Sequence, residues 1–167
     1  MTKVRIYLLL GGFFGADGYV TSAGMFGLRS MLAALPNVTC LTYQWASFET
    51  AADDILKQPT DTTIIVIGYS GGGSRATWLA NLPLRPKVDL MICYDPSPSW
   101  QMKSLAGTNV KRAITYHNTA PFFFGLGGGV LVGPQVQTID IAENHMLVQA
   151  DTTLHQRTVA EVRKMLV

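Results

Sequence analysis

The sequence predicts an α/β protein, a three-layer sandwich in which helices cover both faces of a mostly parallel sheet of about six strands. Two observations carry this prediction. Short apolar runs alternate along the chain with longer segments of helical spacing, which is typical of parallel strands joined by crossover helices. The run at residues 62–69 contains Thr-Thr-Ile-Ile-Val-Ile without polar alternation, as expected for a central strand that is buried on both faces.

Each expected strand is a short apolar run bounded by turn residues. The runs cover residues 4–10, 38–43, 62–69, 88–94, 112–116 and 136–141. Gly11 and Gly12 end the first strand, and the dipeptide Asp95-Pro96 breaks the fourth. Because ligands of such sheets bind beyond the carboxyl ends of the strands, the residues that directly follow each strand are the candidates for chemistry.

Apolar residues at helical spacing mark the expected helices. These helices cover residues 22–35, 48–57, 72–81 and 152–166. The first has Leu28 and Leu32 on one face and ends before Pro36. Ser47 stands where the N-cap of the second helix is expected.

Length and composition fit a single globular domain, residues 1–167. Apolar residues make up 48% of the chain and charged residues only 14%, a composition that excludes intrinsic disorder. The formal charge of +2 comes from scattered basic residues, which argues against nucleic acid as a partner. So few charges leave apolar surface that must face something, and a partner subunit in a homodimer, a lipid or an apolar, lipid-like substrate are the options.

No targeting or transmembrane segment is expected. The apolar run after Arg5 is too short for a signal peptide, so we expect a cytoplasmic protein. Residues 113–139 lack Asp, Glu, Lys and Arg, but two prolines and the glycines at 127–129 would break a membrane helix. Cys40 and Cys93 lie in apolar runs and are expected to be reduced core side chains. No zinc-binding spacing occurs, so no metal is expected.

A Gly-x-Ser-x-Gly pattern follows the third expected strand, in the segment Gly68-Tyr69-Ser70-Gly71-Gly72. Such a short pattern has little specificity by itself, and its position between a buried strand and a helix makes it informative. A serine at this junction lies on a sharp turn and is exposed at the top of the sheet. We therefore predict Ser70 as a nucleophile. The alternative is a glycine-rich turn that contains an incidental serine.

A serine hydroxyl is a good nucleophile only when a base takes its proton. His145 is expected in the short loop between the sixth strand and the last helix, from where it can reach over the sheet toward Ser70. His117 follows the fifth strand and is the second candidate, whereas His155 is expected to pack inside the last helix. We predict His145 as the general base.

The base needs a carboxylate that orients its ring. Asp95 ends the strand that is expected beside the one carrying Ser70, and the following proline sets its direction. Asp140 lies within the last strand and is expected to point off the sheet. We predict Asp95 as the acid, and the alternative is an Asp-Pro turn that only stops the strand.

Two N–H groups are expected to stabilise the oxyanion of the reaction. One belongs to Gly71, the residue after the nucleophile, and the other to the Gly-Gly-Phe-Phe-Gly loop after the first strand. We predict the Phe13 N–H as this second donor, with Phe14 as the second choice. The alternative for this loop is a flexible turn before a helix.

Taken together, these motifs resemble the α/β-hydrolase superfamily over about residues 4–166. The chain looks most like the small cap-less esterases and lipases, including cutinase-like enzymes. It departs from the usual pattern in three ways. The usual first two strands are absent, and Gly11 stands where many members have a histidine. The acid lies one strand earlier than is common, as in lipases of this fold, and the later position holds His117-Asn118 without a carboxylate.

The resemblance implies a minimal α/β-hydrolase fold and a serine hydrolase that cleaves a carboxylic ester or thioester through an acyl-enzyme on Ser70, with no cofactor. Residues expected to line the substrate pocket are Phe14, Tyr69, His117, Phe122 and Phe123. The segment 120–133 forms either a lid or a cover for the sheet edge, and the sequence leaves both open.

Two other classes of function are considered. A non-catalytic binding or scaffold protein on a hydrolase frame is the main alternative, and covalent labelling of the serine distinguishes it. Nucleotide binding is disfavoured because residues 12–18 lack the Gly-x-Gly opening of a dinucleotide loop and residues 68–75 lack the P-loop lysine.

Overall fold

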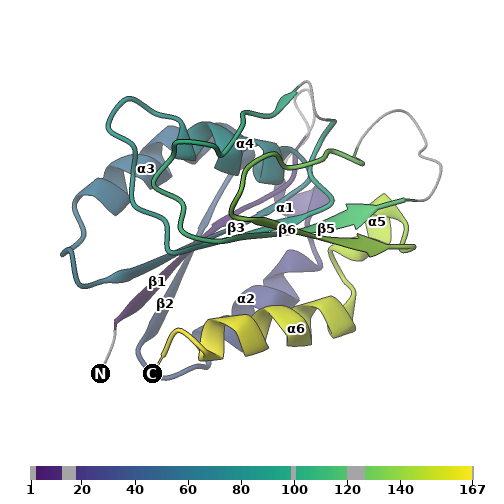
Figure 1. Ribbon diagram of the computed structural model, residues 1–167. Coiled ribbons are helices and arrows are strands. Elements are labelled where there is room, and N and C mark those ends of the chain that lie inside the picture. Colours follow the sequence, from purple (N-terminus) through teal and green to yellow (C-terminus); the bar gives the residue numbers. More distant parts are fainter. Residues whose placement is uncertain (1–2, 13–17, 99–100, 120–126, 167) are drawn as a thin grey trace.

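The computed structural model describes residues 3–12, 18–98, 101–119 and 127–166. Its sheet contains six parallel strands in the order β2-β1-β3-β4-β5-β6 (Figure 1). The strands are β1 (Val4–Leu9), β2 (Val38–Tyr43), β3 (Thr63–Tyr69), β4 (Leu90–Tyr94), β5 (Ala113–Asn118) and β6 (Val136–Ile141). The predicted parallel sheet is therefore confirmed.

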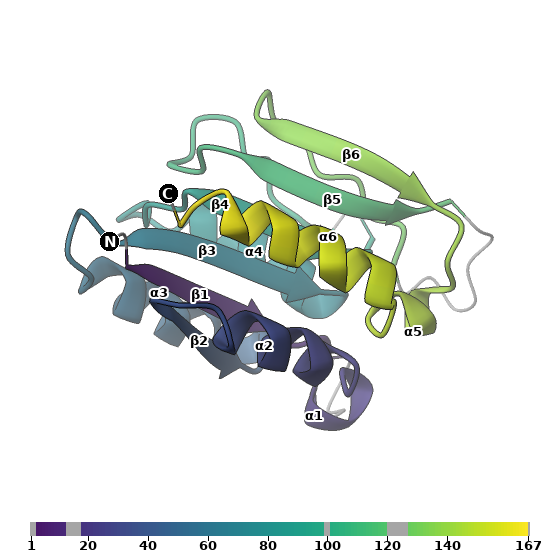
Figure 2. The ribbon, with the colours of Figure 1, turned by 90° about the horizontal axis from the view of Figure 1, so that it is seen from below.

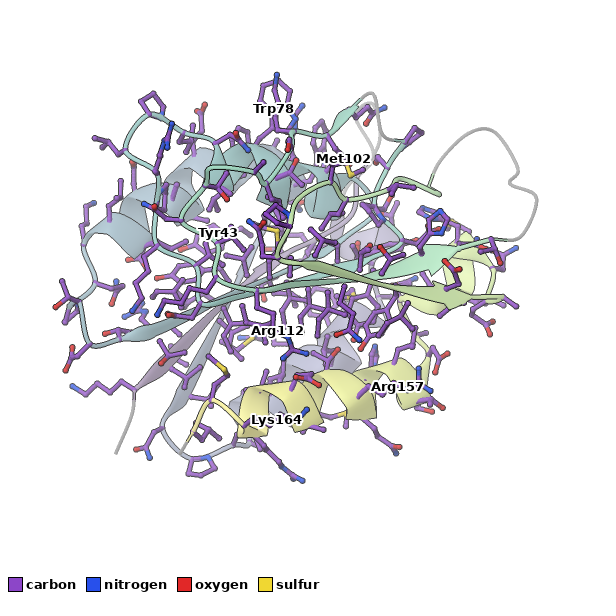
Figure 3. All side chains as sticks on the ribbon, viewed as in Figure 1. Tyr43, Trp78, Met102, Arg112, Arg157 and Lys164 are labelled. Atoms are coloured by element: carbon purple, nitrogen blue, oxygen red, sulfur yellow. The ribbon has the colours of Figure 1, made fainter. Side chains whose placement is uncertain are left out.

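Helices cover both faces of this sheet. They are α1 (Gly18–Thr21), α2 (Met25–Ala33), α3 (Phe48–Leu56), α4 (Gly71–Ala80), α5 (His145–Val148) and α6 (Thr152–Arg163), with a short 3-10 helix at Trp45–Ser47. Helices α2 and α6 lie on one face and α3 and α4 on the other (Figures 1 and 2). In Figure 3, Trp78 of α4 and Arg157 of α6 accordingly lie on opposite sides of the sheet. The predicted three-layer sandwich is confirmed.

Strand β3 is buried on both faces, as its apolar run predicts. Ile65 and Ile67 pack into the core under α2 and α6, whereas Ile64 and Val66 pack into the core under α3 and α4. None of the four is more than 2% exposed. Burial of each such side chain contributes roughly 1.5–3 kcal/mol, so β3 is anchored on both sides and gives the residues that follow it a rigid base.

One prediction about a helix start is wrong, and another is confirmed in position only. His145 was expected in a loop but is the first residue of α5, because the side chain of Asn144 caps this short helix by accepting from the Met146 N–H at 2.8 Å. Ser47 stands at the predicted N-cap position of α3, but it also ends the 3-10 helix, and its side chain makes no capping hydrogen bond.

Helix α2 also begins later than predicted, at Met25 rather than Ser22. The Ser22 hydroxyl instead accepts from the Gly11 N–H at 2.7 Å and lies 3.2 Å from the Gly11 carbonyl oxygen. The hydroxyl of Thr21 donates to the same carbonyl at 2.9 Å. These contacts fix the chain directly after β1, at the edge of the sheet where the predicted site lies.

The described part of the connection between β5 and β6 packs on the α3 and α4 face. Leu131 is buried in that core, and the Leu105 N–H donates to the Val132 carbonyl at 2.7 Å. The Gly129 N–H donates to the Pro96 carbonyl at 3.0 Å. Residues 127–133 therefore cover the sheet. The lid-or-cover alternative was stated for the whole segment 120–133, of which residues 120–126 lie outside the described residues.

Both cysteines are free and buried, as predicted, Cys40 in one core and Cys93 in the other. Among the described residues, no helix is both long enough and apolar enough to cross a membrane.

Candidate active site

The predicted nucleophile, base and acid meet at the carboxyl edge of the sheet. Ser70 directly follows β3 and caps α4, Asp95 directly follows β4, and His145 opens α5. Strands β3 and β4 are neighbours, and their last paired residues are Tyr69 and Tyr94. Ser70 and Asp95, which follow them, therefore lie next to each other at the end of the sheet. His145 reaches them from the connection that follows the edge strand β6.

The turn at Ser70 requires an unusual backbone. Ser70 has φ 51° and ψ −121°, a conformation that costs a non-glycine residue about 1–3 kcal/mol and persists only when the surroundings hold it. Hydrogen bonds provide that restraint: the Ser70 N–H donates to the Tyr94 carbonyl at 3.0 Å, and the Ser97 N–H donates to the Ser70 carbonyl at 3.1 Å.

The two glycines of the Gly-x-Ser-x-Gly pattern are needed for close approach. A Cβ on Gly68 would lie 2.5 Å from the Gly72 carbonyl oxygen, and a Cβ on Gly72 would collide with the Leu9 carbonyl oxygen. Larger residues at either position would force α4 away from β1 and β3. The pattern is thus explained by packing of the strand against the helix.

A continuous hydrogen-bond chain joins the three side chains. The Ser70 hydroxyl oxygen lies 3.0 Å from Nε2 of His145, and Nδ1 of His145 lies 2.5 Å from Oδ2 of Asp95. The serine is partly exposed, whereas the His145 side chain is 2% exposed and the Asp95 side chain is fully buried. Solvent therefore reaches this hydrogen-bond chain from the serine end.

The second oxygen of Asp95 is held by the backbone. Oδ1 accepts from the Gly128 N–H at 2.7 Å and from the Asn118 N–H at 3.3 Å. Both carboxylate oxygens thus have donors, which fixes the plane of the carboxylate and, through it, the ring of His145. Asp95 itself has φ 38°, a left-handed conformation that turns its side chain back over the end of β4.

A glycine at position 127 seals the pair of His145 and Asp95. Gly127 has φ +122°, and a Cβ built there would lie 2.5 Å from Oδ2 of Asp95 and collide with Nδ1 of His145. The backbone of this residue therefore lies directly against the hydrogen bond between the two side chains. The sequence displays the glycine run 127–129, but nothing local indicates that it covers a site formed by residues far away in the chain.

Tyr69 contacts His145 through both its hydroxyl group and its ring. Its hydroxyl donates to the His145 carbonyl at 3.0 Å, and its ring centroid lies 5.2 Å from the imidazole centroid. Burial raises the pKa of Tyr69, with the Asp95 charge adding to the rise, so the phenol stays protonated and remains a donor. Tyr69 was expected to line the pocket; the structure leaves it only 2% exposed, behind His145.

The other two histidines have different partners. His117 lies within β5, and its Nδ1 is 3.0 Å from Oδ1 of Asp140, an exposed side chain that points off the sheet as predicted. His155 is buried in α6, with its Nε2 2.8 Å from the Gln149 carbonyl oxygen, as expected for a packing residue. Ser70 is thus linked to His145, whereas these hydrogen-bond partners of His117 and His155 lie elsewhere in the fold.

The Gly71 N–H lies at the start of α4, where the first N–H groups of a helix have no intrahelical acceptor. In the described part of the chain it makes no hydrogen bond. Gly12 packs against Gly71, since a Cβ on Gly71 would lie 2.6 Å from the Gly12 carbonyl oxygen. The expected second donor, Phe13, lies outside the described residues, as do the predicted pocket residues Phe14, Phe122 and Phe123.

No protein-family model matches the sequence, and a comparison with curated proteins finds no similar sequence. Solved structures with the same architecture are nevertheless found. ClbQ from the colibactin NRPS/PKS pathway has a TM-score of 0.58 and 14% identity, covering 99% of this chain and 97% of its own. A cutinase-like protein from Cryptococcus sp. has a TM-score of 0.54 and 13% identity, covering 95% and 91%. An acetyl xylan esterase has a TM-score of 0.52 and 15% identity, covering 100% of both chains.

These structural similarities, at 13–15% sequence identity, show the fold of the chain. The chain has the α/β-hydrolase fold, of the small cutinase-like type that the sequence resemblance implied. The structural match to the acetyl xylan esterase covers the full length of both chains, so it includes the whole six-strand sheet of this chain.

Proposed function

We propose that the protein is a serine hydrolase that cleaves a carboxylic ester or thioester. One observation carries the proposal: Ser70, His145 and Asp95 come from three separate parts of the chain and form one hydrogen-bond chain. Both ends of the imidazole are engaged, the Nδ1 side by a buried carboxylate and the Nε2 side by a hydroxyl. A packing histidine has no need of this arrangement, whereas a general base does.

The proposed reaction proceeds through an acyl-enzyme. The Ser70 hydroxyl oxygen attacks the carbonyl carbon while Nε2 of His145 takes its proton, and Asp95 stabilises the resulting imidazolium. The tetrahedral intermediate collapses, and His145 returns the proton to the departing alcohol or thiol. Water then enters, loses a proton to His145 and attacks the acyl carbonyl, which releases the acid and restores Ser70.

The oxyanion of the intermediate is assigned to the Gly71 N–H, with a second donor from the loop after β1. The unpaired Gly71 N–H at the start of α4 supports this assignment, because a helix N-terminus favours negative charge. One such donor typically contributes about 3 kcal/mol to transition-state stabilisation. The acetyl xylan esterase among the similar structures supports the class of substrate.

Covalent labelling tests the proposal directly. A fluorophosphonate is added to the purified protein, and the intact mass is recorded over time. We expect one adduct on the parent protein and none on Ser70→Ala. His145→Ala should label about 10²- to 10⁴-fold more slowly, the usual contribution of a general base. His117→Ala is the control for the choice of base and should label far faster than His145→Ala, because His117 pairs with Asp140 instead.

Hydrolysis of p-nitrophenyl esters of increasing acyl length then defines the substrate class. If folded parent protein forms no adduct and cleaves no ester, the proposal is wrong and a binding role on a hydrolase frame takes its place. If His117→Ala loses labelling while His145→Ala keeps it, the base has been misassigned.

A further inference from the structure

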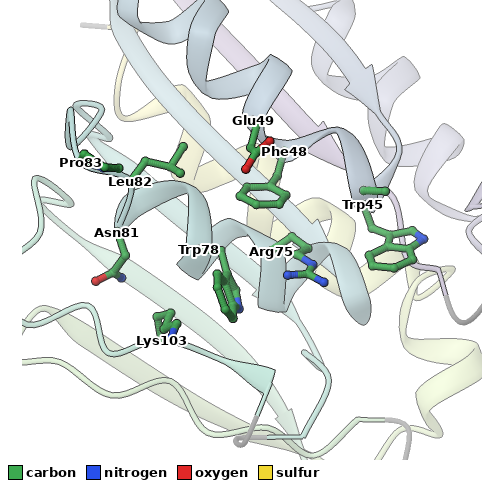
Figure 4. A pocket seen from close by; sticks show the side chains of 10 residues that line it. Trp45, Phe48, Glu49, Arg75, Trp78, Asn81, Leu82, Pro83 and Lys103 are labelled. Carbon is green, nitrogen blue, oxygen red and sulfur yellow. The ribbon is translucent and has the colours of Figure 1, made fainter.

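A second polar site lies on the α3 and α4 face of the molecule, outside the hydrogen-bond chain of Ser70. It is a groove of about 610 Å³. Two tryptophans, Trp45 and Trp78, and two cations, Arg75 and Lys103, line it (Figure 4). Nothing in the proposed hydrolysis uses these four side chains, so their arrangement needs its own explanation.

Arg75 is held by aromatic rings. Its guanidinium carbon lies 5.3 Å from the ring centroid of Trp45, 5.3 Å from that of Trp78 and 5.5 Å from that of Phe48. Figure 4 shows Arg75 between the two tryptophans. Contacts of this kind engage the faces of a guanidinium and leave the N–H groups at its edge free to bind a carboxylate or phosphate through two parallel hydrogen bonds.

Trp78 carries a second cation. The Lys103 ammonium lies 4.3 Å from the Trp78 ring centroid, and the ring is fixed because its Nε1–H donates to the Gln101 carbonyl at 2.7 Å. The fixed indole ring of Trp78 therefore makes cation–π contacts with both Arg75 and Lys103 (Figure 4). Figure 4 shows this indole between Lys103 and Arg75, so the two positive charges lie on either side of the ring.

Neither cation has a carboxylate partner among the described residues. Other basic side chains of the molecule do: Arg112 pairs with Glu161 at 2.6 Å, and Lys111 pairs with Asp89 at 2.7 Å. Glu49 also lines the groove but forms no ion pair with either cation. The end of the groove at Arg75 and Lys103 thus combines open positive charge with apolar ring surface.

We propose that this groove binds an organic anion, a carboxylate or phosphate group attached to an apolar body. The N–H edge of Arg75 binds the anionic group, Lys103 supplies the second positive charge, and the apolar body lies against Trp45 and Trp78. Arg75 lies five residues after Ser70 on α4, and the Trp45 ring lies against Gly12 of the loop after β1, so the groove borders the proposed active site and uses other side chains.

Ligand binding can be measured without any hydrolysis. Phenylphosphonate, phenylacetate and neutral benzyl alcohol are titrated into the protein, and the intrinsic tryptophan fluorescence is followed. We expect saturable binding of at least one of the two anions to the parent protein and to Ser70→Ala alike. Benzyl alcohol should bind at least about tenfold more weakly, and added salt should weaken binding of the anion.

Substitutions locate the site. Arg75→Gln should weaken anion binding by about tenfold or more, Arg75→Lys by less, and Lys103→Gln by about threefold. Arg157→Gln is the matched control, because Arg157 is exposed on α6 on the opposite side of the sheet (Figure 3). The relative affinities of phenylphosphonate and phenylacetate identify which anionic group the site prefers.

Three results would overturn the inference. The first is no saturable binding of either anion to the parent protein. The second is binding that is unchanged in both Arg75→Gln and Lys103→Gln, and the third is equal affinity for benzyl alcohol. Because Ser70→Ala is included, loss of the hydrolytic proposal would leave the outcome of this experiment unaffected.

Discussion

At the scale of single residues, Tyr69 links the end of β3, directly before Ser70, to His145, the proposed base. Replacing Tyr69 with Phe removes the hydrogen bond to the His145 carbonyl and keeps the ring. We expect kcat to fall by about three- to tenfold with little change in KM, since the change loosens the base without touching the substrate. Stability should fall by about 1 kcal/mol. Steady-state kinetics and denaturant unfolding measure the two effects.

Tyr7→Phe is the control for this prediction. Tyr7 is also fully buried, and its hydroxyl lies 2.6 Å from Asp54, away from the site. Its loss should lower stability by a similar amount and leave kcat unchanged. Equal kcat values in Tyr69→Phe and the parent would mean that His145 is positioned by other contacts alone.

Gly127 gives a second prediction at this scale. Gly127→Ala places a methyl group against the hydrogen bond between His145 and Asp95 and imposes a side chain on a backbone at φ +122°. We expect the rate of ester hydrolysis to fall about 100-fold or more. A displacement of the His145 imidazole relative to Ser70 by about 1 Å is enough for such a loss. Hydrolysis rates and circular dichroism are the measurements.

Gly107→Ala separates strain from the effect on the site. Gly107 has φ +74°, but a Cβ there meets nothing within 4 Å. This variant should lose some stability and keep full activity. If both variants retain activity, the seal over His145 is not needed for catalysis.

The candidate site illustrates what a sequence reveals about residues. Ser70 and Asp95 follow apolar strands directly, so their positions at the sheet edge could be predicted from local patterns. The contacts of Gly127 and Tyr69 with His145 could not, because they depend on how distant segments fold over one another. The sequence of a glycine run does not indicate which distant side chain will contact it.

At the scale of elements, His155 connects α6 to the end of α5. Its ring is 4% exposed and contacts the Gln149 carbonyl, and burial lowers its pKa below the ordinary value of 6.5. The unfolded chain therefore binds a proton at a higher pH than the folded chain does. Stability is complete above about pH 6.5 and declines as the pH falls below that value.

His155→Gln tests this link between the two helices. Glutamine retains an N–H donor for the Gln149 carbonyl and does not titrate. We expect Tm to fall less between pH 7.5 and pH 5 in the variant than in the parent, as followed by circular dichroism. The basic partners of Asp89 and Glu161 lower the pKa values of these carboxylates. Their protonation therefore destabilises the protein only in more acidic solution, below the range from pH 7.5 to pH 5. Parallel curves for the two proteins would contradict the prediction.

Strands were more predictable than helix starts. The bounds of β2 and β6, the two edge strands, match those expected, because both short runs are rich in β-branched residues and follow a turn that contains proline. The starts of α2 and α5 depend on single side chains instead. Ser22 bonds to Gly11 after β1, and Asn144 caps α5, choices that apolar periodicity does not record.

At the scale of the whole molecule, the sheet separates two cores, and each contains one cysteine. Cys40 lies under α2 and α6, and Cys93 lies under α3 and α4. Burial raises the thiol pKa of Cys40 to about 11 and that of Cys93 to about 12. Both thiols are therefore protonated at neutral pH and shielded from reagents, since the thiolate is the reactive form.

Thiol labelling can thus report whether the two cores unfold together. With Ellman's reagent at pH 8, we expect no rapid reaction of the native protein and reaction of both thiols in strong denaturant. Because every strand contributes to both cores, a protein of this size should expose them in one transition. Cys40→Ala and Cys93→Ala variants, each with one thiol, should then label at the same rate in the transition region once corrected for their stabilities. A faster rate for Cys40, which lies on the edge strand β2, would show instead that β2 and α2 open before the central strands.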